Sequence, residues 1–183
     1  MTENRILMEK ARKSLSGNWE QPILTYLVYC LITGIGGPAG LIIGGPMQFG
    51  ASFFSLNLSR NKKAEFIQIF DGFKTKVSES IIAYLLMVLY VVLWSLLLVI
   101  PGIIAAISYS QTFFILAENK NISGVDALEK SKKMMMGRKG KYFELCMRFT
   151  GWFILSILTM GIGFLWLIPY TQVSFANFYK DIK

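Results

Sequence analysis

The sequence predicts an all-α membrane protein: a polytopic helical bundle of about six transmembrane helices, paired as three hairpins, each preceded by an amphipathic helix on the cytoplasmic surface. Two observations predict this fold. Asp, Glu, Lys and Arg are absent from residues 21–59, 80–117 and 149–179. Each of these stretches also contains glycine or proline near its middle. Helices of soluble proteins need a polar face, whereas long uncharged apolar runs are typical of membrane-spanning helices.

The length of each uncharged stretch fits two spans. The stretches contain 39, 38 and 31 residues, and one span needs about 20. Turns are predicted at Gly34–Pro38, Pro101–Gly102 and Gly161–Gly163, because glycine and proline favour tight turns. The third stretch is short, so its first helix is expected to begin near Lys141. Hairpins that dip into one leaflet and return are the alternative.

The distribution of charge predicts the orientation. All 19 Lys and Arg residues and all 11 acidic residues lie in residues 1–20, 59–80, 117–148 and 180–183. An even number of predicted spans separates these segments, so all four should face the same side. The positive-inside rule makes that side the cytoplasm. We therefore expect a protein of the cell (inner or cytoplasmic) membrane with both termini in the cytoplasm.

An internal repeat is visible in the charged segments. Residues 9–17 resemble residues 129–137 at an offset of 120, and the segment around Gly72 repeats the pattern more loosely. The apolar helix faces predicted from the three copies are Leu7, Met8, Ala11 and Leu15; Phe66, Ile69, Phe70 and Phe73; and Ala127, Leu128, Ser131 and Met135. We therefore expect one membrane domain, 1–183, with repeat units of about 1–60, 61–120 and 121–183.

The predicted surface helices carry basic residues opposite their apolar faces. Such helices lie in the headgroup plane of a bilayer, and each Lys or Arg contributes about 1 kcal/mol of attraction to an anionic leaflet. The expected partners are therefore the lipid bilayer and anionic lipid headgroups at the cytoplasmic face. Docking of a membrane-protein partner is the alternative role for these helices. Nucleic acid is not expected, because no soluble basic face with a recognition element is visible.

Three glutamines occupy equivalent positions in the predicted second helix of each hairpin. Residues 108–111 resemble residues 169–172, and residues 46–48 form a weaker third copy. Gln48, Gln111 and Gln172 could therefore converge on a polar site within the membrane. The alternative is interhelical hydrogen bonding, worth about 0.6 kcal/mol per bond.

Two prolines lie inside predicted spans. Pro46 and Pro169 each remove a backbone hydrogen bond, so each should kink or break its helix. A broken helix exposes backbone groups that can form a substrate site, whereas a plain kink is tolerated in membrane helices. The prolines therefore belong to the same candidate intramembrane site as the glutamines.

A stripe of glycines begins the second predicted span. Gly36, Gly40 and Gly44 are spaced by four, which lets helix backbones approach closely. We predict helix packing within the chain at these residues. The alternatives are a homo-oligomer interface and, for Gly36, a place in the preceding turn.

Residues for chemistry are scarce in this sequence. Histidine, the commonest general base and metal ligand, is absent. No nucleophile elbow, phosphate loop or Cys/His metal spacing is found. Cys30 and Cys146 are expected to be buried bystanders. We therefore expect no catalytic residues, no cofactor and no metal; a membrane enzyme built on acids alone is the alternative.

Several motifs together resemble a known family. Trp94–Ile103 followed by Tyr109–Ser110 is similar to the central signature of a bacterial integral membrane family catalogued as domain of unknown function 975. Further similar blocks are Asn18–Trp19, Asp71–Phe73, Ser131–Gly137, Gly151–Trp152, Gly161–Gly163, Trp166, Pro169–Tyr170 and Phe178–Tyr179. The resemblance implies a multi-pass bacterial membrane protein without an established molecular function. It supplies no catalytic residues.

Two functions are compatible with these observations. The first is a membrane module without catalytic activity, acting as an accessory or regulatory subunit or in defence against membrane-active peptides. The second is a small transporter or channel-like oligomer with a site near the predicted broken helices. The repeated basic surface helices favour the first, and the prolines and the glycine stripe favour the second.

Overall fold

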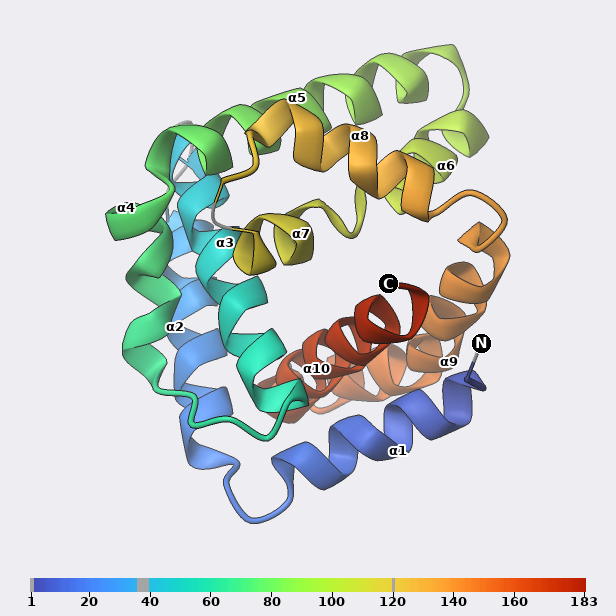
Figure 1. The fold of residues 1–183 in the computed structure, drawn as a ribbon. Helices are drawn as coiled ribbons and strands as arrows, with labels where there is room; N and C mark the ends of the chain where they lie inside the picture. The colour runs from blue at the N-terminus through green and yellow to red at the C-terminus, as the bar shows by residue number, and fades with distance from the viewer. Residues whose placement is uncertain (1, 36–39, 120) are drawn as a thin grey trace.

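All regular structure in the described residues is helical, which confirms the predicted all-α class (Figure 1). The computed structural model describes residues 2–35, 40–119 and 121–183. The helices in chain order are α1 (Asn4–Leu15), α2 (Glu20–Ile35), α3 (Gly40–Ser59), the 3-10 helix η2 (Phe66–Phe70), α4 (Asp71–Thr75), α5 (Val77–Leu97), α6 (Val99–Tyr109), α7 (Thr112–Glu118), α8 (Gly124–Met134), α9 (Lys139–Leu158) and α10 (Phe164–Ile182).

Two helical segments of the described chain are long and apolar enough to cross a membrane. They are α5 and the combined α6–α7 segment, with mean hydropathies of 2.4 and 1.7. The other predicted spans are shorter or more polar: α2 has 16 residues, and α9 carries Lys141, Glu144 and Arg148 in its first half.

The first and last surface helices bury the faces that their periodicity predicts. Leu7, Ala11 and Leu15 of α1 are buried, and Met8 is half-buried. The matching residues of the α8 segment, Ala127, Leu128, Ser131 and Met135, are also buried. Each helix is followed by a glycine in the left-handed region, Gly17 with φ +91° and Gly137 with φ +72°. The two segments that resemble each other in sequence therefore share one local structure.

The middle segment differs from its predicted amphipathic face. Ile69 is buried and Phe70 half-buried, but Phe66 and Phe73 are 38% and 40% exposed. The reason is local geometry, because the segment forms a 3-10 turn followed by a five-residue α-helix. A 3-10 helix has three residues per turn, so the four side chains do not form a single α-helical stripe.

The surface helices pack in a cyclic order. Helix α1 lies against α10, η2 and α4 lie against α3, and α8 lies against α5, α6 and α7. Each of these segments therefore contacts a helix from a different predicted repeat: η2 and α4 contact α3, and α8 contacts α7. The contact of α1 with the C-terminal helix α10 closes the ring (Figure 1).

Helix α3 approaches its neighbours at backbone distance because of glycine. A Cβ on Gly45 would lie 2.4 Å from the Ser80 carbonyl oxygen of α5, and one on Gly50 would lie 1.9 Å from the Ile69 oxygen of η2. A Cβ on Gly72 would lie 2.1 Å from the Pro46 oxygen. No side chain fits at these three crossings, so the helices meet through backbone atoms.

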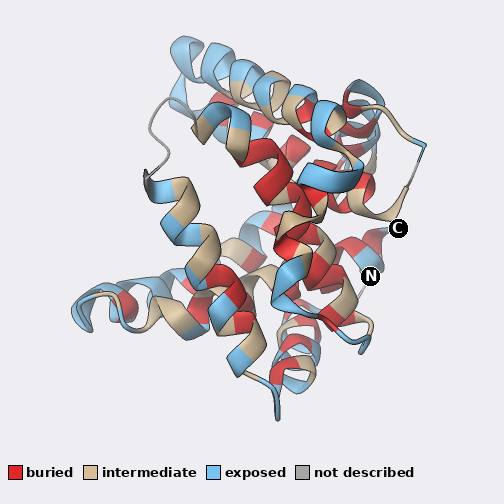
Figure 2. Ribbon diagram, turned by 90° about the vertical axis from the view of Figure 1, so that its left-hand side faces the viewer, coloured by how far each residue is buried: buried red, intermediate tan, exposed pale blue. Residues whose placement is uncertain are grey.

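In helix α5 the large apolar side chains lie outside and the small ones lie inside. Helix α5 buries Ser80 and Ala83, whereas Leu96 near its end is 78% exposed. Met160, in the turn between α9 and α10, is 95% exposed. Figure 2 shows these exposed hairpin turns on the side away from both chain termini. In water this distribution would be unfavourable, and extended exposed apolar patches mark binding or membrane surfaces.

A matched pair of glycine substitutions tests the α3 crossing. Gly50→Ala should destabilise the fold by about 1–3 kcal/mol, because the new methyl group must displace backbone atoms of η2. Gly151→Ala in α9 meets no atom within 4 Å and should stabilise its helix by up to about 1 kcal/mol. Thermal unfolding of the purified protein in mild detergent, followed by circular dichroism, measures both. Equal midpoints for the two variants would contradict the close crossing.

Candidate functional site: a basic face and a polar cavity

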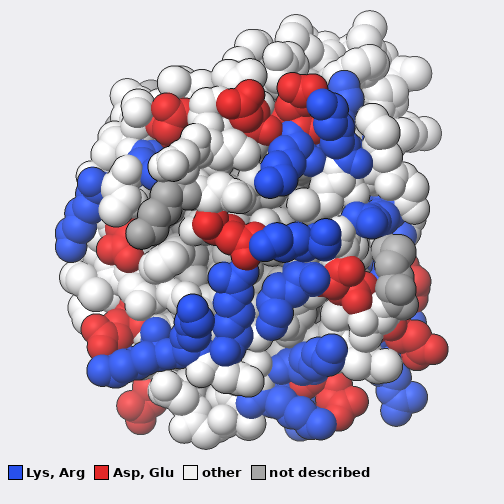
Figure 3. Space-filling view, viewed as in Figure 1, with Lys and Arg blue, Asp and Glu red and all other residues white. Residues whose placement is uncertain are grey.

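Charged side chains gather on the face where the C-terminal ends of α3, α7 and α10 meet. Figure 3 shows Lys and Arg across the middle and lower part of this face, while the α5–α6 hairpin at the upper right is white. Glu118 lies at the centre of this ionic cluster. It forms ion pairs with Arg60 and with Lys183, whose Nζ lies 2.8 Å away. The Tyr179 hydroxyl donates to the same carboxylate at 2.6 Å.

The surroundings of Glu118 keep it ionised. Burial raises the pKa of its carboxyl, but hydrogen bonds from Lys183, Tyr179 and Arg60 outweigh burial and lower the pKa to about 2. Lys180 sits beside this cluster and donates to the Ser59 carbonyl oxygen at 2.5 Å. The cluster thus ties the end of α3 to α7 and to the C-terminal helix.

A second acid joins the two ends of the chain. The Thr2 backbone amide donates to both carboxylate oxygens of Asp181 at 3.0 Å. Lys141 of α9 forms an ion pair with it at 2.9 Å. Burial raises the pKa of Asp181, but these hydrogen bonds and the Lys141 charge lower it to about 2. The N-terminal segment, α9 and α10 are therefore held together at the charged face.

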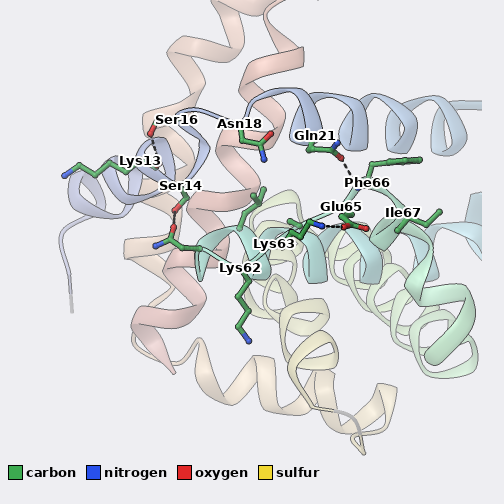
Figure 4. A pocket seen from close by; sticks show the side chains of 13 residues that line it. Lys13, Ser14, Ser16, Asn18, Gln21, Lys62, Lys63, Glu65, Phe66 and Ile67 are labelled. Carbon is green, nitrogen blue, oxygen red and sulfur yellow. Dashed lines mark hydrogen bonds and ion pairs between the residues drawn. The ribbon is translucent and has the colours of Figure 1, made fainter.

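A polar groove of about 780 Å³ lies at one edge of the basic face, between the end of α1, the start of α2 and the segment after α3 (Figure 4). The Gln21 side-chain oxygen accepts from the Phe66 backbone amide at 3.2 Å, which braces the groove. Lys63 forms an ion pair with Glu65 at 2.9 Å, but its side chain is 87% exposed. Exposed charges of this kind interact weakly and are screened by salt. The groove can attract anionic groups without holding them rigidly.

Two of the three predicted glutamines line one cavity. Gln48 of α3 and Gln172 of α10 face a space of about 390 Å³ together with Ser110 and Tyr142. The remaining lining side chains are apolar, from α5, α6, α7 and α10. The Tyr29 hydroxyl donates to the Gln48 side-chain oxygen at 2.7 Å. The Gln172 side chain is half-buried.

Gln111 lies next to the cavity rather than in its wall. Its side chain is fully buried, and its Nε2 donates to the hydroxyl of Ser110 at 2.9 Å. Its side-chain oxygen is buried without a partner in the described part of the chain. The three glutamines are therefore neighbours, with Gln111 connected to the cavity through Ser110.

Neither predicted proline breaks its helix. Helices α3 and α10 continue through Pro46 and Pro169, so the broken-helix alternative is wrong at these residues, and the plain kink stays a prediction. The interruption instead falls at Ser110 and Gln111, between α6 and α7, where no proline is present. Packed neighbours can hold a helix intact despite the backbone bond that a proline removes.

A hydroxyl from another helix bridges this interruption. The Gln111 backbone amide donates to the Ser131 hydroxyl of α8 at 3.2 Å, and that hydroxyl donates to the Ser108 carbonyl oxygen at 2.8 Å. Ser131 thus satisfies one donor and one acceptor that the helix leaves open.

Only part of the predicted glycine stripe lies at a close helix contact. Gly44 lies against the Tyr84 ring of α5, whose Cζ would be 2.8 Å from an added Cβ. Gly40 is 3.9 Å from its nearest such neighbour, an oxygen of Thr33. Gly36 lies outside the described residues. The tightest crossings of α3 instead use Gly45 and Gly50, which the four-residue spacing does not include.

Nothing in the sequence indicated one polar residue of the cavity wall, Tyr142. Tyr142 belongs to a charged segment, which gave no reason to place it in a site. Ser110 was visible as the neighbour of Gln111 in the repeated motif. The wall offers neutral amide and hydroxyl groups, which can hydrogen-bond a small polar molecule. No group of three or more His, Cys, Asp or Glu that could hold a metal ion is found in the described chain.

The fold and site define the class: an all-helical protein with two helices able to cross a membrane, an apolar outer surface and one basic face. Residues 96–183 match the family described as "Protein of unknown function (DUF975)". The family resemblance seen in the sequence is confirmed over these residues. Comparisons with curated proteins and with solved structures found no match to the chain.

The ionic cluster predicts a pH dependence of stability. The pKa of Glu118 is about 2 in the folded protein, below its ordinary value of 4.5. Its contribution is therefore full above about pH 5 and is lost as the pH falls towards 2. Glu118→Gln should lower the thermal midpoint at pH 7, and the difference from the wild type should shrink at acidic pH.

Glu129→Gln is the matched control, because Glu129 pairs with Lys133 on an exposed helix face. This control should change the midpoint little at either pH. Thermal unfolding in detergent at pH 7 and pH 3 makes the comparison. A pH-independent effect of Glu118→Gln would contradict the role of the ionised carboxylate.

Proposed function

We propose that the chain is a multi-pass protein of the cell membrane, with three hairpins forming about six spans and both termini in the cytoplasm. It acts without catalysis, as an accessory or regulatory module or in defence against membrane-active peptides. The observation that carries this proposal is the distribution of side-chain sizes in α5, the most apolar helix able to cross a membrane. Small residues such as Ser80 and Ala83 are buried in α5, while large apolar residues such as Leu96 are exposed.

This distribution is the one that a bilayer favours. Lipid tails solvate large apolar side chains, so helices in a membrane associate through small residues that let their backbones approach. The glycine crossings of α3 follow this rule. The basic face supports a cytoplasmic orientation and attraction to anionic headgroups.

Single-cysteine labelling tests the topology. In a chain with Cys30 and Cys146 replaced by Ala, single cysteines are placed at Leu98, Met160 and Lys63. An impermeant maleimide should label the Leu98 and Met160 positions in intact cells, because both residues lie in exposed hairpin turns. The Lys63 position should react only after the membrane is opened.

A further cysteine at Lys132 completes this test. Positions Lys63 and Lys132 should show the same accessibility, because the basic segments are expected on one side. Labelling of these two positions from opposite sides would contradict the topology. Protection of Leu98 and Met160 in cells, with reaction in detergent, would instead favour shallow hairpins.

The accessory role needs a separate measurement. Purification from the native membrane in mild detergent should recover a membrane-protein partner, or deletion should raise sensitivity to cationic membrane-active peptides. Replacing the exposed Lys62 and Lys63 by Gln should reduce the recovery of the partner or the protection against peptides, without changing helicity. A deletion strain with unchanged sensitivity, together with purification of the chain alone, would contradict this role.

The polar cavity favours a second candidate function, the passage or binding of a small neutral polar solute. Gln48 and Gln172 come from different hairpins and face the same space. In a membrane, such a cavity would offer hydrogen bonds without a charge. Pairs of amides at this position suit an uncharged solute better than an ion.

Solute flux into proteoliposomes tests this second function. The wild-type protein should increase urea or glycerol permeability above that of empty liposomes in a stopped-flow light-scattering assay. Gln48→Leu and Gln172→Leu should return the rate towards the background. Gln68→Leu, which makes the same change outside the cavity, should retain it. A wild-type rate equal to that of empty liposomes would contradict the transport function.

A further inference from the structure

A second groove, mostly apolar, lies between the α1–α2 turn and helices α9 and α10. Three of the four tryptophans of the chain, Trp19, Trp152 and Trp166, line it with Leu155 and Tyr170. Its volume is about 440 Å³, within the range of roughly 300–1,000 Å³ that is typical of small-molecule sites. The groove is separate from the polar cavity and from the basic groove of Figure 4.

Among the residues that line this groove, Arg12 alone is charged. Arg12 of α1 belongs to the lining, and no ion pair to its guanidinium is found in the described residues. The acid nearest to it along α1, Glu9, is already paired with Lys13 at 2.9 Å. The Arg12 guanidinium in the groove lining is therefore a cation without an ion-pair partner in the described residues.

The Ser156 and Thr159 hydroxyls in the lining are not free donors. The Ser156 hydroxyl donates to the Trp152 carbonyl oxygen at 2.8 Å, and the Thr159 hydroxyl donates to the Ser156 oxygen at 2.9 Å. Both hydroxyls are thus satisfied within α9. The groove therefore combines one cation with a mostly apolar wall, which is the chemistry that suits an anionic amphiphile.

We propose that this groove binds one anionic phospholipid of the membrane, with its phosphate on Arg12 and an acyl chain along the tryptophans. This proposal rests on the membrane location proposed above. A zwitterionic lipid carries its own cation beside the phosphate, and a cationic peptide would be repelled by Arg12. The charge of the groove therefore selects an anionic headgroup.

Tryptophan fluorescence can test this lipid site, because three of the four tryptophans line the groove. Trp94→Phe removes the tryptophan of α5, which lies outside the groove, so that the remaining fluorescence reports on the groove. The full-length protein is reconstituted in phosphatidylcholine vesicles with increasing fractions of phosphatidylglycerol that carries brominated acyl chains. Brominated phosphatidylcholine in unbrominated phosphatidylglycerol is the reciprocal series. Bromine quenches tryptophan on contact, so the two series measure which lipid occupies the groove.

Quenching should be saturable and should favour brominated phosphatidylglycerol. Arg12→Gln should lower this preference about fivefold, the effect expected for one basic residue at an anionic leaflet. Arg5→Gln is the matched control, because it removes the same charge from α1 outside the groove. It should change the preference less than twofold. Thr159→Phe places a bulky ring in the groove lining, so it should reduce quenching by both lipids.

Equal quenching by the two brominated lipids would overturn the proposal, because the groove would then be an ordinary lipid-facing surface. Equal effects of Arg12→Gln and Arg5→Gln would also overturn it, since the preference would then come from general surface charge. Helicity and gel-filtration volume of each variant show that it is folded. Cysteine labelling tests the topology independently, so a failed lipid site and a failed membrane topology give different results.

Discussion

The close approach of α3 to its neighbours is the constraint on which the rest of the structure depends. At Gly45 and Gly50 the backbone of α3 meets the backbone of α5 and η2 without space for a methyl group. Rotation of a side chain cannot relieve such a contact, because the atoms on both sides belong to the main chain. Helix α3 also packs against α2, α7 and α10. Its position therefore determines where the other hairpins lie.

This arrangement brings together groups that are far apart in the sequence. The ends of α3, α7 and α10 meet at the charged face, where Glu118 accepts hydrogen bonds from Arg60, Lys183 and Tyr179. Earlier in α3 and α10, Gln48 and Gln172 face a common cavity. A largely satisfied ionic cluster and a cavity lined by two side-chain amides have different consequences. The first stabilises the packing, whereas the second leaves hydrogen-bonding groups available to a ligand.

Periodicity predicted the surface helices well where the helix was regular. The buried faces of α1 and α8 follow from a spacing of three and four residues, because both segments are α-helical over three turns. The same argument failed at Phe66 and Phe73, where a 3-10 turn replaces the α-helix. The positions of the prolines also did not predict where a helix is interrupted. Pro46 lies inside an intact helix, whereas the helix interruption occurs beside Gln111, where a hydroxyl from α8 replaces the missing backbone bonds.

The sequence by itself determined the all-helical class, the segregation of charge into four segments and the family resemblance over residues 96–183. These properties depend on composition and local pattern. Only the tertiary structure decided that Tyr142 joins Gln48 in one cavity and that Arg12 lines one groove with Trp19, Trp152 and Trp166. It also decided that Gly50 rather than Gly40 carries a helix crossing. The physical reason is that a contact between distant residues depends on where helices cross. Crossing points are set by the steric fit of whole surfaces, which the periodicity of one segment does not contain.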